Sequence, residues 1–479
     1  MLKLTALSPE DIEAIHQATL QVLSETGILL SQPEGREIMT DAGAQVRDTR
    51  LLLPPDLVEK AVSQCPRQVT IRGRGGKTVV LGDGQLHWHN LGGARDIYDP
   101  LNGQRRPAML QDVRDGTRLL DALESVTTVT PLFTPQDVPG ALMSLAMYRH
   151  ALSCTTKPLQ GPGVQTAVEV GFAVHMASVL GSPREYLSLS VSPVSPLTFP
   201  DEIIKAIIEI ARHGIAFAPL PCPTSGTTAP FSLAGSLVQQ NAEVLASVTL
   251  AQLVHPGLPI VYCGRLSMME PRTGASVWGG VELGLASAGT VQVGHRYGLP
   301  VNVYGFSTNS HTLDIQSGYE RALNAIIPAL AGADELSGIG EMEAGVMSSY
   351  AQMVCDDEIA LSVHRLRRGF SAGEDALAVE VIASAMAGTR NFMAQKHPSR
   401  YLHGGEVLLT RLAERRTWEI WEREGRQGIA ERAQTEAERI LADHQVTPLG
   451  EDQERKLEEI MVEAEQKLVK AQVKQSISK

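Results

Sequence analysis

Aromatic residues, closely spaced cysteines and long apolar runs are all scarce in this chain. The scarcity of each bears on the kind of protein that the chain can form. Phe, Trp and Tyr make up only 4% of the residues, so each ring near a predicted loop is a candidate binding group. The five cysteines are scattered and show no CxxC spacing, which argues against a disulfide framework and favours a reducing cytoplasm. No run of about 18 apolar residues predicts a transmembrane helix. The N-terminus also lacks the apolar core of a signal peptide.

Basic residues are outnumbered by acidic ones, 42 to 54, which gives a net charge of -12. Phosphate backbones are bound by clustered Lys and Arg, so nucleic acid is not expected as a partner. The hydrophobic content of 43% and charged content of 20% are typical of a soluble globular protein. We therefore expect a cytoplasmic protein that has neither nucleic acid nor a membrane as a partner.

The first 84 residues are predicted to form a helical and β cap ahead of the main domain. A helix begins at Ser8, a good N-cap residue, with Asp11 at the third helical position. Two further helices are expected at 34–42 and 55–64, followed by short strands near 68–72 and 78–81. The glycines of RGRGGK, between those strands, lack the spacing of a phosphate loop and predict a turn.

Strands and helices alternate from residue 85 to about residue 400, which is typical of parallel α/β folds. Eight such units favour a TIM-like (β/α)8 barrel. The alternative is an open doubly wound sheet, which usually carries a Gly-rich phosphate turn that we do not find. The predicted strands are at 86–91, 126–133, 158–160, 186–191, 215–220, 259–263, 301–306 and 336–340. The predicted helices are at 110–123, 139–152, 164–180, 201–212, 233–254, 278–297, 318–331 and 356–368.

The last segment, 401–479, is rich in Glu, Arg, Lys and Ala and predicts a C-terminal helical extension. Trp418 and Trp421 stand at near-helical spacing in it. Its charged face is interpreted as solvated, with binding of a partner as the alternative.

The loop after the strand at 301–306 is the strongest candidate for a site. It carries Asn309 and His311 within the stretch GLPVNVYGFSTNSHTLDIQ, between an apolar strand and a helix. Sites in parallel α/β folds are usually built where strands end. Rings near other predicted strand ends would form a cage for a quaternary ammonium if they converge. The candidate substrate-binding residues are thus Trp88, His89, Tyr98, Phe231, Tyr304, Phe306, Asn309, His311 and Tyr350.

Other chemistries have weaker support in the sequence. His87 and His89 point to one face of a strand, but catalytic zinc takes about three protein ligands, so no metal is expected. The GxSxG elbow of serine hydrolases is absent. Glu341 and Glu343 lie at a predicted strand end and leave open an acid/base hydrolase. No catalytic residue is assigned.

Long ordered segments identify a family more specifically than any short motif. They are LSPEDIEAIHQATLQVLSETGI, DIYDPLNGQRRPAMLQDVRDGTRLLDAL, TPQDVP, LDIQSGYERALNAIIPALAGADELSGIGEMEAG and VCDDEIALSVHRLRRG. From about residue 5 to about residue 410 the chain resembles the trimethylamine methyltransferase family, in the branch that lacks pyrrolysine. The resemblance implies a TIM-like barrel and the transfer of a methyl group from an amine to Co(I) of a corrinoid (cobalamin) carried by a separate protein.

The missing pyrrolysine bears on the expected substrate. This residue is thought to activate a tertiary amine, whereas a quaternary amine already has a positively charged leaving group. The resemblance therefore implies a quaternary amine, with glycine betaine as the first expectation and proline betaine or carnitine as alternatives. Donors such as Arg265, Asn309 and His311 would bind its carboxylate. No tightly bound cofactor is expected, a homo-oligomer is possible, and a non-catalytic betaine-binding barrel is the alternative function.

Overall fold

The computed structural model describes residues 2–388 and 390–477. The N-terminal segment begins as predicted. Ser8 caps the first helix by accepting a hydrogen bond from the backbone N–H of Asp11, at 3.1 Å, and the Asp11 carboxylate accepts one from the backbone N–H of Ser8. The helices of this segment are α1 (Pro9–Gln21), α2 (Pro33–Asp41) and α3 (Pro55–Ser63). Its strands are β1 (Ile28–Leu30), β2 (Gln45–Arg47) and β3 (Arg50–Leu52), and β1 also pairs with β10 (Thr198–Phe199), much further along the chain.

Parallel strands occupy the centre of the molecule. β13, β16, β17 and β6 form one four-stranded sheet, and β9 and β11 form a second sheet. The predicted α/β class is therefore confirmed. The strands are β6 (His87–Asn90), β9 (Ser188–Val191), β11 (Ala216–Pro219), β13 (Tyr262–Cys263), β16 (Val301–Tyr304) and β17 (Glu335–Ile339).

These strands do not form one continuous closed sheet. The predicted strands near 129 and 159 meet only through a single bridge, Val129 to Leu159, and the two sheets meet through another, Phe217 to Ile260. Prolines are one physical reason, since Pro158, Pro219 and Pro259 have no backbone N–H to donate to a ladder.

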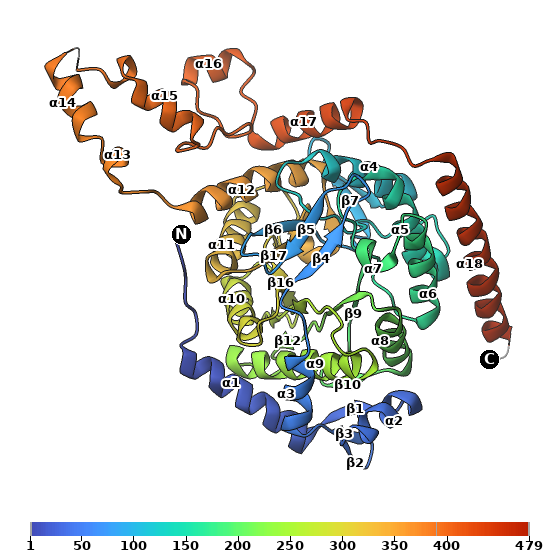
Figure 1. Cartoon of the computed structure of the whole chain (residues 1–479). Helices are drawn as coiled ribbons and strands as arrows, with labels where there is room; N and C mark the ends of the chain where they lie inside the picture. The colour runs from blue at the N-terminus through green and yellow to red at the C-terminus, as the bar shows by residue number, and fades with distance from the viewer. Residues whose placement is uncertain (1, 389, 478–479) are drawn as a thin grey trace.

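Eight long helices surround the strands in a ring (Figure 1). In α8 the isoleucines at 204, 207, 208 and 210 are buried, and Gly214 ends the helix with a left-handed backbone (φ 66°). The helices are α4 (Leu110–Ala122), α5 (Met143–Cys154), α6 (Ala167–Ser178), α8 (Asp201–His213), α9 (Leu233–Val254), α10 (Val281–Arg296), α11 (Ile315–Ala331) and α12 (Tyr350–Arg368), with a short α7 (Pro183–Tyr186) between α6 and β9.

A β-hairpin crosses the middle of this ring (Figure 1). It consists of β4 (Val69–Arg72) and β5 (Thr78–Leu81), and its connection is the RGRGGK turn that the sequence predicted. Ile71 and Leu81 pack in a small apolar cluster with Ala216 and Val261 of the central strands. The hairpin therefore supplies an apolar wall inside the ring.

Short strands form two further sheets. β7 and β8 form a hairpin that pairs with β19, and β14 lies between β12 and β15. These strands are β7 (Asp96–Asp99), β8 (Gln104–Pro107), β12 (Thr224–Ser225), β14 (Ser267–Met269), β15 (Ser276–Val277), β18 (Glu341–Met342) and β19 (Met347–Ser348).

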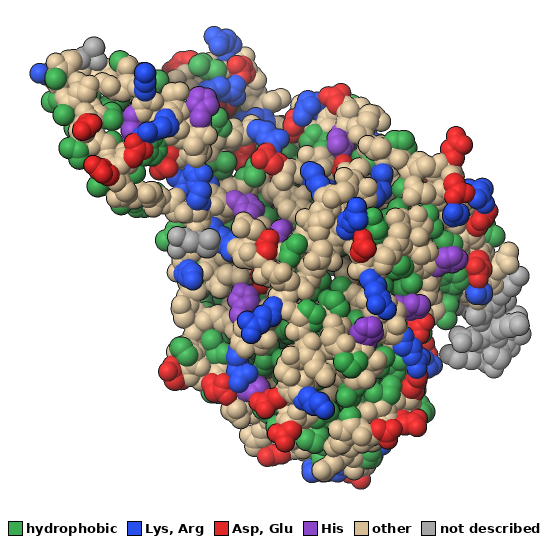
Figure 2. Space-filling model, viewed as in Figure 1, with side chains coloured by type: hydrophobic (Ala, Val, Ile, Leu, Met, Phe, Trp, Pro, Cys, Tyr) green, Lys and Arg blue, Asp and Glu red, His purple; other side chains and the backbone are tan. Residues whose placement is uncertain are grey.

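The C-terminal part consists of separate helices that are joined by non-helical segments, such as residues 404–417 and 444–450. An arm that carries α13 to α16 stands away from the main body in both views (Figures 1 and 2). α17 packs on α12, and α18 contacts α5 and α6. The helices are α13 (Glu374–Leu377), α14 (Val379–Ala387), α15 (Lys396–His403), α16 (Trp418–Arg423), α17 (Ile429–Asp443) and α18 (Glu451–Ile477). In the described part of the chain, no helix is both long and apolar enough to cross a membrane.

Candidate functional site

A cavity of about 560 Å³ lies inside the ring of helices. Its size falls within the range of about 300–1,000 Å³ that is usual for small-molecule sites. The hairpin residues Ile71 and Leu81 line one part of it, and Gly92, Gly93 and Gly345, from loops that follow β6 and β18, line another. The cavity thus reaches from the apolar hairpin to the loops after the strands, where sites of parallel folds are usually found.

The polar centre of this cavity is the carboxylate of Glu335, at the start of β17. Its side chain is 1% exposed. Thr128 donates a hydrogen bond to it at 2.6 Å, Gln160 donates at 3.1 Å, and Asn302 of β16 donates through its amide. Burial acts to raise the pKa of Glu335, but the positive charge that His89 carries when it is protonated at acid pH, together with the hydrogen bonds from Thr128 and Asn302, outweighs burial and holds the pKa below its ordinary value. Glu335 is therefore an ionised carboxylate.

His89 of β6 lies beside this carboxylate, with its Nε2 3.8 Å from Oε2 of Glu335. Burial lowers the pKa of His89 below its ordinary value of 6.5, so the imidazole is neutral at neutral pH. The Asn302 amide N–H faces Nε2 at 2.8 Å, which leaves Nδ1 as the protonated nitrogen, 3.2 Å from the Thr130 hydroxyl. The pair of His89 and Glu335 therefore carries one net negative charge.

A second charge in the cavity wall belongs to Arg265. Its guanidinium carbon lies 4.7 Å from the centroid of the Tyr304 ring, a cation–π distance. Trp278 packs edge-on against the same ring, with 5.1 Å between centroids. The stack holds the guanidinium group in one orientation at the cavity.

Asn309 supports this stack through hydrogen bonds to the backbone around Trp278. Its side-chain oxygen accepts hydrogen bonds from the backbone N–H groups of Trp278 and Gly279, at 2.7 and 2.8 Å, and its amide donates to the carbonyl of Ser276. All of these bonds lie within the protein, so Asn309 positions Trp278, which in turn packs against Tyr304.

The structure brings only some of the predicted site residues together. His89 and Tyr304 line the cavity. Trp88 and Phe306 are fully buried and stack on each other, with 4.8 Å between centroids. The remaining four lie outside the cavity lining: Tyr98 is half-buried in β7, Tyr350 donates a hydrogen bond to Asp112, and Phe231 and His311 are exposed. Their roles in binding remain predictions.

The polar group around the Glu335 carboxylate was not recognised in the sequence: it consists of the cavity residues Glu335, Asn302 and Gln160, and of Thr128, which donates to Glu335 but does not line the cavity. A signal was present for the two that lie in regular strands. Asn302 and Glu335 are polar residues within or next to apolar strands, in VNVY and ELSGI. A buried polar side chain in a parallel strand needs partners, and such partners are found on the neighbouring strands.

The two carboxylates left open as acid/base groups are placed differently from each other. Glu341 is 1% exposed and accepts a hydrogen bond from Ser307 at 2.9 Å, whereas its second oxygen has no partner among the described residues. Burial raises the pKa of Glu341 to about 8. Glu343 is partly exposed and lies near Arg105. Neither lines the cavity.

The raised pKa of Glu341 predicts that the free energy of unfolding depends on pH. Its pKa is higher in the folded protein, about 8, than the ordinary value of 4.5, so the folded state binds the proton more tightly than the unfolded state does. The free energy of unfolding should therefore fall as pH rises through this window. Urea titrations between pH about 5 and about 8 should give a weaker decline for Glu341→Gln than for the wild type. Equal slopes for the two proteins would contradict this expectation.

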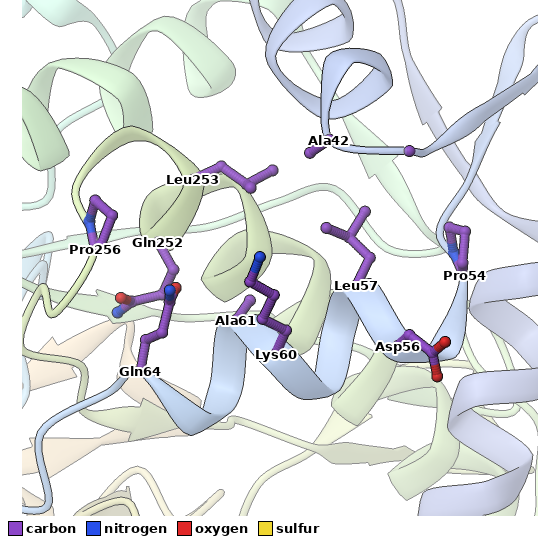
Figure 3. Close-up of a pocket in the computed structure, with 11 residues that line it drawn as sticks. Ala42, Pro54, Asp56, Leu57, Lys60, Ala61, Gln64, Gln252, Leu253 and Pro256 are labelled. Carbon is purple, nitrogen blue, oxygen red and sulfur yellow. The ribbon is translucent and has the colours of Figure 1, made fainter.

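A second hollow, of about 490 Å³, lies on the outside between α3 and the end of α9. Figure 3 shows Gln64 and Gln252 close together at one end of it and Asp56 at the other. Its charged residues, Asp56 and Lys60, are exposed, and Gln252 is occupied by hydrogen bonds to the backbone of Gly257 and Leu258. It therefore lacks a buried charge, and the inner cavity is the better candidate. Within the described residues, no three His, Cys, Asp or Glu side chains gather as a metal site requires.

Comparison with known proteins gives the family. The family model described as trimethylamine methyltransferase matches residues 1–468. The trimethylamine methyltransferase of Desulfitobacterium hafniense strain DCB-2 is 32% identical over 96% of this chain and 94% of its own length. The glycine betaine methyltransferase of D. hafniense strain Y51 is 28% identical over 95% and 96%. The structure of the monomethylamine methyltransferase of Methanosarcina barkeri covers 90% of this chain and 92% of its own, with a TM-score of 0.49 and 14% identity. The chain therefore belongs to the trimethylamine methyltransferase family.

Proposed function

We propose that this protein transfers a methyl group from a quaternary amine, glycine betaine in the first place, to Co(I) of a corrinoid held by a separate protein. The observation that carries the proposal is the ionised Glu335 in the wall of a small cavity beside a neutral His89. A quaternary ammonium ion has no N–H to donate, so a negative charge nearby is what can recognise it. Membership of a methyltransferase family supports the reaction class, and the family implies the corrinoid partner.

The chemistry asks little of the side chains beyond positioning. Co(I) in the acceptor protein is a strong nucleophile, and the amine leaves as a neutral molecule with the electron pair of the broken C–N bond. The enzyme has to hold the methyl group in line with the acceptor and keep water away. Such positioning lowers a barrier by roughly 7–11 kcal/mol in favourable cases. The apolar wall made by Ile71 and Leu81 suits the exclusion of water.

We further propose that the eight predicted strands, with the helices that follow them, form a (β/α)8 barrel over residues 85–400. Residues 1–84 would be its cap, and residues 401–479 would be its C-terminal extension. Backbone hydrogen bonds support this where regular strands are missing: Thr127 N–H to Trp88, Gln160 N–H to Val129, and Gly161 N–H to Ser188. In that arrangement the corrinoid protein docks over the loops that follow the strands. A cytoplasmic location and a homo-oligomer belong to the same proposal.

The test is a visible-spectrum assay with the purified protein and a cobalamin held as Co(I), first free and then in a corrinoid protein from the same source. The panel contains glycine betaine, proline betaine, carnitine and trimethylamine. We expect loss of the Co(I) band and growth of methyl-Co(III) with a quaternary amine. Reaction with trimethylamine alone would contradict the proposed substrate class. No reaction, together with calorimetric binding of a betaine, would favour the non-catalytic binding barrel.

A further inference from the structure

Arginine side chains are buried at three positions of the described chain, and two of them have carboxylate partners. Arg149 pairs with Glu454 at 2.5 Å, and Arg321 pairs with Asp356 at 2.8 Å. Arg265 is only 5% exposed, yet no carboxylate of the described residues lies within 4.0 Å of it. Buried charges are normally paired, because an isolated charge in a low-dielectric interior is costly.

The contacts of Arg265 within the protein are to neutral acceptors. One terminal nitrogen donates to the carbonyls of Asn302 and Gly264, at 3.0 and 3.2 Å, and the other donates to the side-chain oxygen of Asn302. All three bonds come from the two terminal nitrogens, and the side chain lines the cavity. Because a guanidinium group stays protonated in proteins, its positive charge remains uncompensated on the cavity side.

Asn302 separates the two charges of the cavity. Its oxygen accepts from Arg265, and its amide donates to Glu335. A positive and a negative charge thus face one cavity, with a single asparagine between them. This arrangement is complementary to the two opposite charges of a small zwitterion. Because Tyr304 and Trp278 hold the guanidinium plane in place, little side-chain freedom is lost when an anion binds.

We propose that Arg265 binds the carboxylate of the substrate while Glu335 faces its ammonium group, so that Arg265 selects betaines over quaternary amines without a carboxylate. The inference rests on the proposed function and assigns one pole of the substrate to each charge. Arginine suits this role because its fork of N–H donors matches a carboxylate.

Calorimetry with two ligands tests the assignment without any corrinoid. Glycine betaine and tetramethylammonium share the methylated ammonium group, and only the first has a carboxylate. We expect the wild type to prefer glycine betaine. Arg265→Gln should weaken glycine betaine binding about 10- to 100-fold, the range for a lost charge-assisted hydrogen bond, and change tetramethylammonium binding less than about threefold. Arg272→Gln, at an arginine whose side chain is 85% exposed, is the matched control and should bind as the wild type does.

A conservative variant covers the case in which Arg265→Gln does not fold. Arg265→Lys keeps the charge and loses the fork, so it should fold and weaken glycine betaine binding selectively. Equal losses for both ligands, no loss for either, or no binding of glycine betaine to the wild type would overturn the assignment. Selective binding without methyl transfer would support it while the proposed reaction fails. Methyl transfer together with equal binding of both ligands would support the proposed reaction and overturn the assignment of Arg265.

Discussion

Replacing Glu335 by glutamine should raise KM for glycine betaine about 100-fold while kcat changes less than about tenfold. The variant removes the negative charge next to the ammonium group and keeps the size of the side chain. At about 5 Å and an effective dielectric constant of about 20, the attraction between two unit charges is roughly 3 kcal/mol. This corresponds to about a 100-fold change in affinity. Steady-state kinetics with methyl-Co(III) formation as the readout would measure both constants.

The unequal effect on KM and kcat follows from the course of the reaction. The positive charge on nitrogen disappears as the C–N bond breaks, so Glu335 stabilises the bound substrate more than the transition state. An interaction of this kind contributes to binding and little to the chemical step. A fall in kcat of more than about 100-fold with unchanged KM would contradict this role and indicate that Glu335 acts in the chemical step.

Glu343→Gln is the matched control for this experiment. Its carboxylate belongs to the segment after β18, is partly exposed and does not line the cavity. It should leave both kinetic constants within about twofold of the wild type. If Glu343→Gln and Glu335→Gln had the same effect, the cavity would not be the site.

The sequence predicts helices of this fold well, because their signals are local. Ser8 and Asp11 form the expected N-terminal cap, and the isoleucines of α8 repeat with helical spacing before Gly214. Strand pairing is not local. The segments at Val129 and Leu159 read as strands, yet each contributes one bridge, because ladder formation depends on neighbours and on prolines that lack an N–H.

The candidate site was harder to predict than the fold. The aromatic residues at strand ends suggested a cage, but Trp88 and Phe306 use their surfaces in packing against each other. The cavity instead depends on polar residues of separate strands, among them His89, Asn302 and Glu335. Their convergence follows from strand order and register, which the sequence alone does not supply. The loop residue Asn309 is near the site, but its hydrogen bonds hold Trp278.

The end of the strand that carries Glu335 is held by a buried ion pair. Gly340 follows β17, and its N–H donates to the carboxylate of Asp356 at 2.7 Å. The same oxygen of Asp356 accepts from Arg321 at 2.8 Å, and both side chains are fully buried. The pair therefore links α11, α12 and the end of β17. A substitution at Asp356 should thus disturb the strand that carries Glu335.

Asp356→Ala should lower the free energy of unfolding by at least about 3 kcal/mol, the second large effect that we expect. Removing one partner leaves Arg321 as an uncompensated charge at the protein interior, which typically costs about 3–5 kcal/mol. Burial raises the pKa of Asp356 to about 6, so the experiment belongs near pH 8, where the carboxyl group is ionised. A urea titration followed by circular dichroism would show the loss as a lower midpoint.

An exposed ion pair serves as the control that separates the effect of burial from the effect of removing a charge. Asp452 pairs with Arg455 on α18, where the two side chains are 61% and 59% exposed. Asp452→Ala should change the free energy of unfolding by less than about 1 kcal/mol, because water solvates the remaining charge. If both variants lost the same small amount, the interior around Arg321 would have to admit water. If Asp356→Ala alone lost stability and also weakened glycine betaine binding, the buried pair would hold the strand end that places Glu335.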